Sequence, residues 1–299
     1  MADALRIGMI GLDTSHAGAF TKLLNTPSNP HHVPGGTIVK AFPGGSDRMA
    51  VSRDRVGSFT DEMRDTFHID IVDSVEAAAA EVDAVMLTSV DGRQHLEQFE
   101  AISANGIPVF IDKPLAASVA DATAIFEKAE ASGSPVMSCS SIRYAVGIDE
   151  LGAGKTAVGC IAAGPVAILE DFPAYFWYGI HTAEVLFSKM GTGCREVSVT
   201  ANEKADVITG TWDDGRTGTI YGYRFDGVYA FEATVYTGDG AEHGVAASDP
   251  PYYARLLPHI LSFFRSGNPA IPPSETIEIA AFLEAANAAR ESGRPEPVR

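Results

Sequence analysis

The sequence predicts an α/β protein with a doubly wound parallel sheet in its first half and an α+β domain with a mostly antiparallel sheet in its second half. Three observations predict this architecture. Apolar segments alternate with helical segments over residues 5–138, a turn at Gly11 joins the first of them to a helix, and β-like segments cluster between helices after residue 143. Alternation is typical of parallel sheets with right-handed crossovers, and clustering is typical of α+β domains.

Residues 1–143 are expected to form a Rossmann-like domain, because a strand, a tight glycine turn and a helix open dinucleotide-binding folds. The first strand is expected at 5–12, and the next helix begins near Ser15 with Asp13 as its N-cap. Further strands are expected at 37–42, 69–72, 83–89, 107–111 and 134–138, and helices at 58–67, 75–81, 93–105 and 118–131.

Residues 144–299 are expected to form the second domain, with its last helices packing back on the first. The glycine- and alanine-rich segment 147–164 is interpreted as a mobile or connecting stretch. A helix is expected at 178–190, strands at 196–201, 207–212, 217–223 and 230–237, and closing helices at 252–265 and 274–290. Asp213-Asp214-Gly215 predicts a hairpin turn between two of these strands.

Composition argues against several classes of protein. The 299 residues carry 22 Lys+Arg and 39 Asp+Glu, a net charge of −17, which disfavours nucleic acid and anionic membranes as partners. We find no signal-peptide pattern and no apolar run of about 20 residues. Cys139, Cys160 and Cys194 are odd in number and far apart, as expected of structural thiols in a reducing compartment. A cytoplasmic protein is therefore expected.

The segment around Lys113 is the first candidate site. Residues 107–111 are apolar without alternation, as in a strand buried on both faces, and the strand stops at Asp112-Lys113-Pro114. Open α/β sheets bind ligands at the carboxyl ends of their strands. Lys113 is thus either a functional lysine or an ordinary loop lysine.

Taken together, the motifs resemble those of the Gfo/Idh/MocA family, the relatives of glucose–fructose oxidoreductase and inositol dehydrogenase. The resemblance covers nearly the whole chain. It is carried by the opening turn, by Asp112-Lys113-Pro114 in place of the family's Glu-Lys-Pro, and by Gly179-Ile180-His181-Thr182-Ala183-Glu184 in place of its Gly-x-His-x-x-Asp.

The resemblance implies NAD(P)-dependent oxidation or reduction of a sugar, polyol or related hydroxy or carbonyl compound, in a homodimer or homotetramer. Lys113 would orient the substrate hydroxyl and His181 would exchange its proton, as an imidazole can near neutral pH. Expected substrate contacts are Asp112, Trp177, Tyr178, Glu184, His95 and Arg143, and expected cofactor contacts are Gly8, Gly11, Asp13, Thr14, Ser15, His16, Ser46, Ser89, Asp91 and Lys113. Alternatively, His181 is satisfied in a domain interface, and Glu184 either fixes the imidazole or is solvated.

The glycine fingerprint departs from the family. Asp13 and His16 stand where the second and third glycines belong. A carboxylate near a bound phosphate would repel it by roughly 1 kcal/mol at about 4 Å in water, and by about 4 kcal/mol at an effective dielectric near 20. His16 would partly offset this repulsion.

Three other segments also depart. Residues 43–46 replace the acidic residue that binds the ribose, so that Ser46, Arg48 or Arg53 would be left to accept a 2′-phosphate. Trp177 replaces an aspartate, and the aromatic run 175–178 is either a sugar-stacking wall or a core cluster. Residues 89–95 replace a Thr-Pro-Asn loop, although His95 is kept.

These departures leave two other classes of function open. The acidic and imidazole groups expected near the sheet edge are Asp13, His16, Asp91, His95, Asp112 and His181. Such ligands suit Zn²⁺ or Mn²⁺ in a metal-assisted lyase, isomerase or hydrolase, but no pair has a tight helical spacing, so no metal is predicted. A sugar- or nucleotide-binding regulatory protein is the other alternative, because fold does not fix function.

Overall fold

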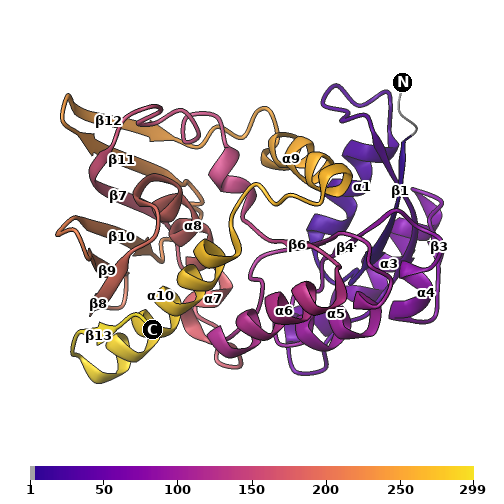
Figure 1. Cartoon of the computed structure of the whole chain (residues 1–299), viewed down its shortest axis with the longest axis horizontal. Helices are drawn as coiled ribbons and strands as arrows, with labels where there is room; N and C mark the ends of the chain where they lie inside the picture. The colour runs from indigo at the N-terminus through magenta and orange to yellow at the C-terminus, as the bar shows by residue number, and fades with distance from the viewer. Residues whose placement is uncertain (1–3) are drawn as a thin grey trace. The chain divides into compact units, whose positions relative to one another are not determined.

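The computed structural model describes residues 4–299 (Figure 1). The chain forms two compact units. The first contains the chain up to Ala116 together with Ala120–Cys139 and Tyr253–Ile271, and the second contains Ala117–Val119, Ser140–Tyr252 and Pro272–Arg299. The helix expected at 252–265 therefore contributes most of its residues to the first unit.

The first unit is built on a six-stranded parallel sheet with the order β3-β2-β1-β4-β5-β6. Its strands are β1 Leu5–Ile10, β2 Gly36–Phe42, β3 Asp70–Ile71, β4 Ala84–Leu87, β5 Val109–Ile111 and β6 Val136–Met137. The order reverses between β1 and β4, and this switch point is where such sheets bind ligands. The predicted doubly wound parallel sheet is confirmed.

The helices of this unit follow the predicted alternation. They are α1 Ser15–Asn25, α2 Ala50–Arg53, α3 Val56–Asp65, α4 Val75–Ala79, α5 His95–Ser103, α6 Val119–Ser132 and α9 Tyr252–Ser266. The N-cap predicted for α1 is wrong: Thr14, not Asp13, precedes the helix in extended conformation and accepts a hydrogen bond from the His16 amide. Asp13 has other partners, which are described below.

The second unit contains a seven-stranded sheet with the order β12-β11-β7-β10-β9-β8-β13, antiparallel except between β7 and β10. Its strands are β7 Ala157–Pro165, β8 Cys194–Ala201, β9 Ala205–Trp212, β10 Thr217–Tyr223, β11 Glu232–Thr237, β12 Gly240–Val245 and β13 Glu296–Pro297. Its helices are η1 Ser141–Tyr144, α7 Ala174–Trp177, α8 Gly179–Met190 and α10 Pro273–Ser292. This mostly antiparallel sheet confirms the predicted fold class, and the predicted turn joins β9 to β10.

The interpretation of 147–164 as a mobile or connecting stretch is wrong for its second half. Residues 157–165 form β7, which pairs with β10 on one side and β11 on the other. Its small residues serve close packing: a Cβ added at Gly164 would lie 2.5 Å from the Thr182 hydroxyl oxygen on α8. The composition therefore reflects a helix lying tightly on the sheet.

The two faces of this sheet differ. Helices α8 and α10 cover one face: Cβ atoms added at Gly218 and Gly210 would meet Leu186 of α8 and Phe282 of α10. The strand register places exposed apolar side chains together on the other face: Ile161, Tyr221, Tyr236 and Val245, each 40–47% exposed. Within residues 4–299, none of the helices combines the length and the apolar character needed to cross a bilayer.

Candidate active site

The switch point of the first unit is shaped by a close approach of backbone segments. Gly11 has a φ of +92°, and a Cβ there would lie 2.2 Å from the amide nitrogen of Ser89 at the end of β4. Gly44, after β2, lies close to Gly11 on another side. The Ser89 hydroxyl is buried without a hydrogen-bond partner among the described residues. A turn this tight requires glycine at position 11.

Asp13 is turned into the protein rather than toward a ligand. Its side chain is fully buried, Oδ2 accepts a hydrogen bond from the Ser52 hydroxyl at 2.6 Å, and Oδ1 accepts one from the Val90 amide at 3.0 Å. Burial raises the pKa of this carboxyl, against the opposing effect of both donors. Asp13 was expected to place a carboxylate beside a bound phosphate, but it instead links the turn after β1 to helix α2 and to the loop after β4.

The loop after β2 is also tied to the loop after β4. The Ser46 hydroxyl donates to Asp91 Oδ2 at 2.7 Å, and the Ser46 amide donates to the Ser52 hydroxyl at 2.7 Å. Asp91 in turn accepts two side-chain hydrogen bonds from Arg93. Burial alone would raise the pKa of Asp91, but the bonds from Arg93 and Ser46 outweigh it and leave the pKa lowered. Ser46 and Asp91, which were both predicted as cofactor contacts, thus hold the loops after β2 and β4 together at the switch point.

Three more predicted cofactor contacts lie in this region, and they differ in how exposed they are: Gly8 and Thr14 are buried, whereas Ser15 is exposed. Gly8 lies in β1, where a Cβ would come 2.0 Å from the Ala78 carbonyl oxygen, so it allows α4 to pack on the sheet. Thr14 is the buried N-cap and Ser15 is exposed at the start of α1. Ser15 is the one of these three that is open to a ligand.

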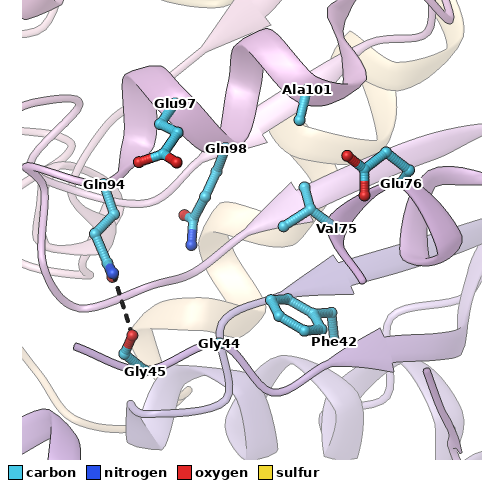
Figure 2. Close-up of a pocket in the computed structure, with 9 residues that line it drawn as sticks. All are labelled: Phe42, Gly44, Gly45, Val75, Glu76, Gln94, Glu97, Gln98 and Ala101. Atoms are coloured by element: carbon cyan, nitrogen blue, oxygen red, sulfur yellow. Dashed lines mark hydrogen bonds between the residues drawn. The ribbon is translucent and has the colours of Figure 1, made fainter. Parts of the chain in front are cut away.

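A cavity of about 350 Å³ lies beside the carboxyl end of β2. Phe42 and Val75 supply apolar walls, and helix α5 covers another side (Figure 2). The Gln98 side chain points from α5 toward Phe42 and is only 8% exposed, and its Oε1 lacks a hydrogen-bond partner among the described residues. The full lining is Phe42, Gly44, Gly45, Val75, Glu76, Gln94, Glu97, Gln98 and Ala101.

Lys113 stands at the carboxyl end of β5, as predicted. It is half-buried, and burial lowers the pKa of its ammonium, although the neighbouring Asp112 opposes that shift. Asp112 is itself held by His16, whose Nδ1 lies 2.6 Å from Oδ2. The His16 ring packs against Tyr253, with ring centroids 4.9 Å apart. The residue at the third-glycine position therefore holds the aspartate beside the lysine.

His95 has a structural environment. Its side chain is fully buried, and its two ring nitrogens lie 3.0 Å from the Leu115 carbonyl oxygen and 2.8 Å from the Ser89 carbonyl oxygen. Both polar atoms of the ring are therefore used inside the protein. The predicted substrate contact is not available to this imidazole, which instead links the loops after β4 and β5.

His181 belongs to the second unit, on the first turn of α8. Its Nδ1 lies 2.7 Å from the hydroxyl oxygen of Ser140, which also accepts a hydrogen bond from the Ile142 amide. The rings of Tyr178 and Phe231 flank the imidazole, each with its centroid 5.6 Å away. The side chain is thus positioned from three sides.

Glu184 pairs with Arg143 rather than lying in solvent, so its interpretation as a solvated residue is wrong. Arg143 Nε donates to Glu184 Oε2 at 2.8 Å, and its Nη2 also lies 2.7 Å from Glu275 in a second ion pair. Burial raises the pKa of Glu184, and the nearby Glu275 adds to the rise, while Arg143 opposes it. The partner found for His181 is Ser140.

The aromatic run at 175–178 divides into two parts. Tyr175 and Phe176 are fully buried, whereas Trp177 and Tyr178 are half-buried. Their ring centroids are 6.0 Å apart, and Tyr178 continues to His181. Tyr175 and Phe176 therefore form a core cluster, while a sugar-stacking wall at Trp177 and Tyr178 stays a prediction.

Sequence reasoning missed Ser140, Glu275, Gln98 and Tyr253. Of these, only Gln98 carried a usable signal, as a glutamine next to Phe99 and one turn from Ile102 on the buried face of α5. Within residues 4–299, no group of three or more His, Cys, Asp and Glu side chains is arranged to hold a metal ion. The three cysteines are buried free thiols.

Comparisons with known proteins agree with this architecture. A family model, Gfo/Idh/MocA, described as an oxidoreductase family with an NAD-binding Rossmann fold, matches residues 5–139. No curated protein matches the sequence. Among solved structures, GenD2 from gentamicin A biosynthesis in complex with NAD has a TM-score of 0.79 at 16% identity, with 100% of this chain and 97% of that chain covered.

Two further structures give similar agreement. myo-Inositol 2-dehydrogenase from Lactobacillus plantarum has a TM-score of 0.79 at 13% identity, covering 99% of this chain and 100% of its own. An oxidoreductase from Agrobacterium radiobacter in complex with NAD⁺, L-tartaric acid and magnesium has a TM-score of 0.74 at 16% identity, covering 99% of each chain. At such identities the likeness shows the fold, while the family-model match over residues 5–139 agrees with the expected enzyme class and cofactor type. Residues 5–139, somewhat less than half of the chain, thus resemble the Gfo/Idh/MocA oxidoreductase family with its NAD-binding Rossmann fold.

Proposed function

We propose that the chain is an NAD(P)-dependent oxidoreductase acting on a sugar, polyol or related hydroxy or carbonyl compound. The observation that carries this proposal is the pairing of a cavity beside β2 with the glycine turn at Gly11, at the ligand-binding edge of the sheet. The inward turn of Asp13 supports it, because both oxygens of that carboxylate already accept hydrogen bonds within the protein. The residues present therefore fit a dinucleotide.

Lys113 and His181 are proposed to act on the same substrate. A bound nicotinamide would supply the hydride acceptor or donor. Lys113, with its pKa lowered by burial, would donate a hydrogen bond to the reacting oxygen and hold it in place. His181 would take the proton from that oxygen in oxidation and return it in reduction, a role that imidazoles fill in many enzymes. Ser140 would hold the imidazole in its orientation through Nδ1.

A polyhydroxylated substrate is supported by the side chains around His181. Tyr178 is a half-buried ring against the imidazole, and the half-buried ring of Trp177 packs against Tyr178. Such rings can pack against the C–H face of a sugar while its hydroxyls form hydrogen bonds elsewhere. One relative in fold is named as an inositol dehydrogenase, which agrees with this substrate class.

The test is turnover with a panel of inositols, aldoses and sugar acids, read as NADH or NADPH absorbance. Lys113→Ala and His181→Asn should each lower kcat by at least about 100-fold, and His181→Asn should leave dinucleotide binding unchanged. His243→Asn is the matched control, because His243 is exposed on β12 and its loss should leave turnover unchanged. Normal turnover in both site variants would refute the assignment.

We further infer that the open face of the second sheet joins copies of the chain into a homodimer or homotetramer. Four apolar side chains on that face are 40–47% exposed, and exposed apolar patches of this kind mark association surfaces. A cytoplasmic location, expected from the cysteine pattern, stays a prediction.

A further inference from the structure

The cavity beside β2 contains a buried polar group that the protein itself leaves unsatisfied. Gln98 is more than nine-tenths buried, and no described residue donates to its Oε1. A buried amide oxygen without a donor costs free energy, so a native structure rarely keeps one without a reason. Because the amide points into the cavity toward Phe42 (Figure 2), the missing donor would come from a ligand there.

The chemistry of the cavity selects among ligands. Phe42 and Val75 offer apolar surface suited to a flat ring. A glutamine side chain can pair with the edge of adenine through two hydrogen bonds, accepting from the N6 amino group and donating to N7. Neighbouring Gln94 also has a buried Oε1 without a described donor, but its Nε2 already donates to the Gly45 carbonyl oxygen at 3.1 Å, so it cannot make both bonds of such a pair. Gln98 is therefore the glutamine of this lining whose amide can pair with a base edge through both of its atoms.

The rim of the cavity carries negative charge. Glu97 lies at the end near Gln94 and Gly45, and Glu76 lies at the opposite end beyond Val75 (Figure 2). Both side chains are exposed, and the described lining contains no lysine or arginine. Hydrogen bonds from its own backbone amide and from Ser74 lower the pKa of Glu76, which stays ionised at neutral pH. Carboxylates on the rim can accept hydrogen bonds from ribose hydroxyls, and they repel a phosphate.

We propose that Gln98 recognises the adenine of the dinucleotide and that the carboxylates of Glu97 and Glu76 disfavour a 2′-phosphate, so that the chain selects NAD(H) over NADP(H). This inference rests on the proposed dinucleotide-dependent function and adds the residues that decide the choice. Glu76 on α4 and Glu97 on α5 would take the place of the acidic residue that is expected after β2, because residues 43–46 contain no Asp or Glu. The inference also replaces the expectation that Ser46 accepts a 2′-phosphate, since Ser46 is bonded to Asp91.

The experiment is calorimetric titration of the full chain with three ligands: NAD⁺, its hypoxanthine analogue and NADP⁺. The analogue replaces the N6 amino group by oxygen and so removes the donor that Gln98 Oε1 needs. Wild-type protein should bind NAD⁺ at least about fivefold more tightly than the analogue, and NAD⁺ at least about fivefold more tightly than NADP⁺. Gln98→Leu, which keeps the volume, should bind NAD⁺ and the analogue equally.

The carboxylates are tested on the same helix. Glu97→Gln should strengthen NADP⁺ binding by about fivefold relative to NAD⁺, whereas Glu100→Gln should not, because Glu100 is exposed on α5 but does not line the cavity. If wild-type protein binds none of the three ligands, the proposed function fails. If it binds NAD⁺ but does not distinguish it from the analogue, the inference about Gln98 fails, and this comparison needs no variant. Equal affinity for NAD⁺ and NADP⁺ would overturn the inference about the rim while leaving the proposed function intact.

Discussion

The ion cluster of Arg143 allows a quantitative prediction for Arg143→Met. The substitution keeps most of the side-chain volume but removes the cation from two carboxylates that each lie 2.7 Å away. Glu184 is only 3% exposed, so it cannot recover hydration in place of the arginine. Breaking such a buried pair usually costs about 3–5 kcal/mol. Glu275, at 14% exposure, adds less.

Protonation limits this cost and makes it depend on pH. In the variant, the pKa of Glu184 rises further above its ordinary value of 4.5, so the folded state takes up a proton that the unfolded state lacks. When the pKa of a carboxyl is raised on folding, the folded protein becomes less stable as the pH rises above the pKa of that carboxyl in the unfolded chain. The free energy of unfolding then falls by about 1.4 kcal/mol per pH unit. The loss should therefore reach at most about 3.4 kcal/mol at pH 7 and only about 0.7 kcal/mol at pH 5.

Urea unfolding followed by tryptophan fluorescence measures this loss of stability in the second compact unit, where Arg143 lies. The chain has two tryptophans, Trp177 and Trp212, and both lie in the second unit with Arg143. Arg195→Met is the matched control, because Arg195 is 72% exposed in its pair with Asp213. That variant should lose less than about 0.5 kcal/mol at either pH.

A double variant separates charge from packing. Arg143→Met removes the cation, and adding Glu184→Gln removes the buried carboxylate that would be left unpaired. The double variant should therefore recover most of the stability at pH 7. A loss for Arg143→Met that is equal at pH 5 and pH 7, or no larger than that of Arg195→Met, would refute the reasoning.

Three further predictions follow from single contacts. Gly11→Ala should lower the stability of the first unit by about 2–4 kcal/mol, measured by scanning calorimetry. Gly57→Ala should leave the stability unchanged, because nothing lies within 4 Å of a Cβ added there. Equal melting temperatures for the two variants would contradict the close approach at the switch point. Ser140→Ala should lower kcat about three- to tenfold and alter its pH profile, with KM for the dinucleotide unchanged; an unaltered profile would exclude Ser140 as a positioning residue. Tyr221→Lys should shift the mass measured by light scattering toward the monomer, while Tyr229→Lys, on a loop outside the sheet face, should not; no shift for either would argue against that face as the interface.

The first sheet could be predicted because its physical signal is strong. Buried parallel strands such as β4 and β5 are apolar without alternation, and their neighbours are helices of ordinary length. The second unit was harder for a specific reason. β7 is rich in glycine and alanine because α8 packs closely on it, so its composition resembles that of a linker. β12 is exposed and polar along an edge and carries little hydrophobic pattern.

The site could be predicted only in outline. Motif positions located Lys113, and strand order brought Asp112 and His16 to the same sheet edge. Sequence could not show which way a side chain turns, and that decides the role of Asp13, which has the spacing of a phosphate neighbour but bonds internally to Ser52. Partners distant along the chain, such as Ser140 for His181, depend on tertiary contacts that no local pattern records.

The short C-terminal strand has a practical consequence for handling the protein. β13 pairs with β8 through Glu296 and Pro297, and the Val298 amide donates to the Arg195 carbonyl oxygen. These few residues cover the outer backbone of β8 at Arg195, Glu196 and Val197, which would otherwise offer donors and acceptors to another polypeptide. Trimming the last four residues should therefore promote edge-to-edge aggregation, and an affinity tag is better fused ahead of the first strand than behind Arg299.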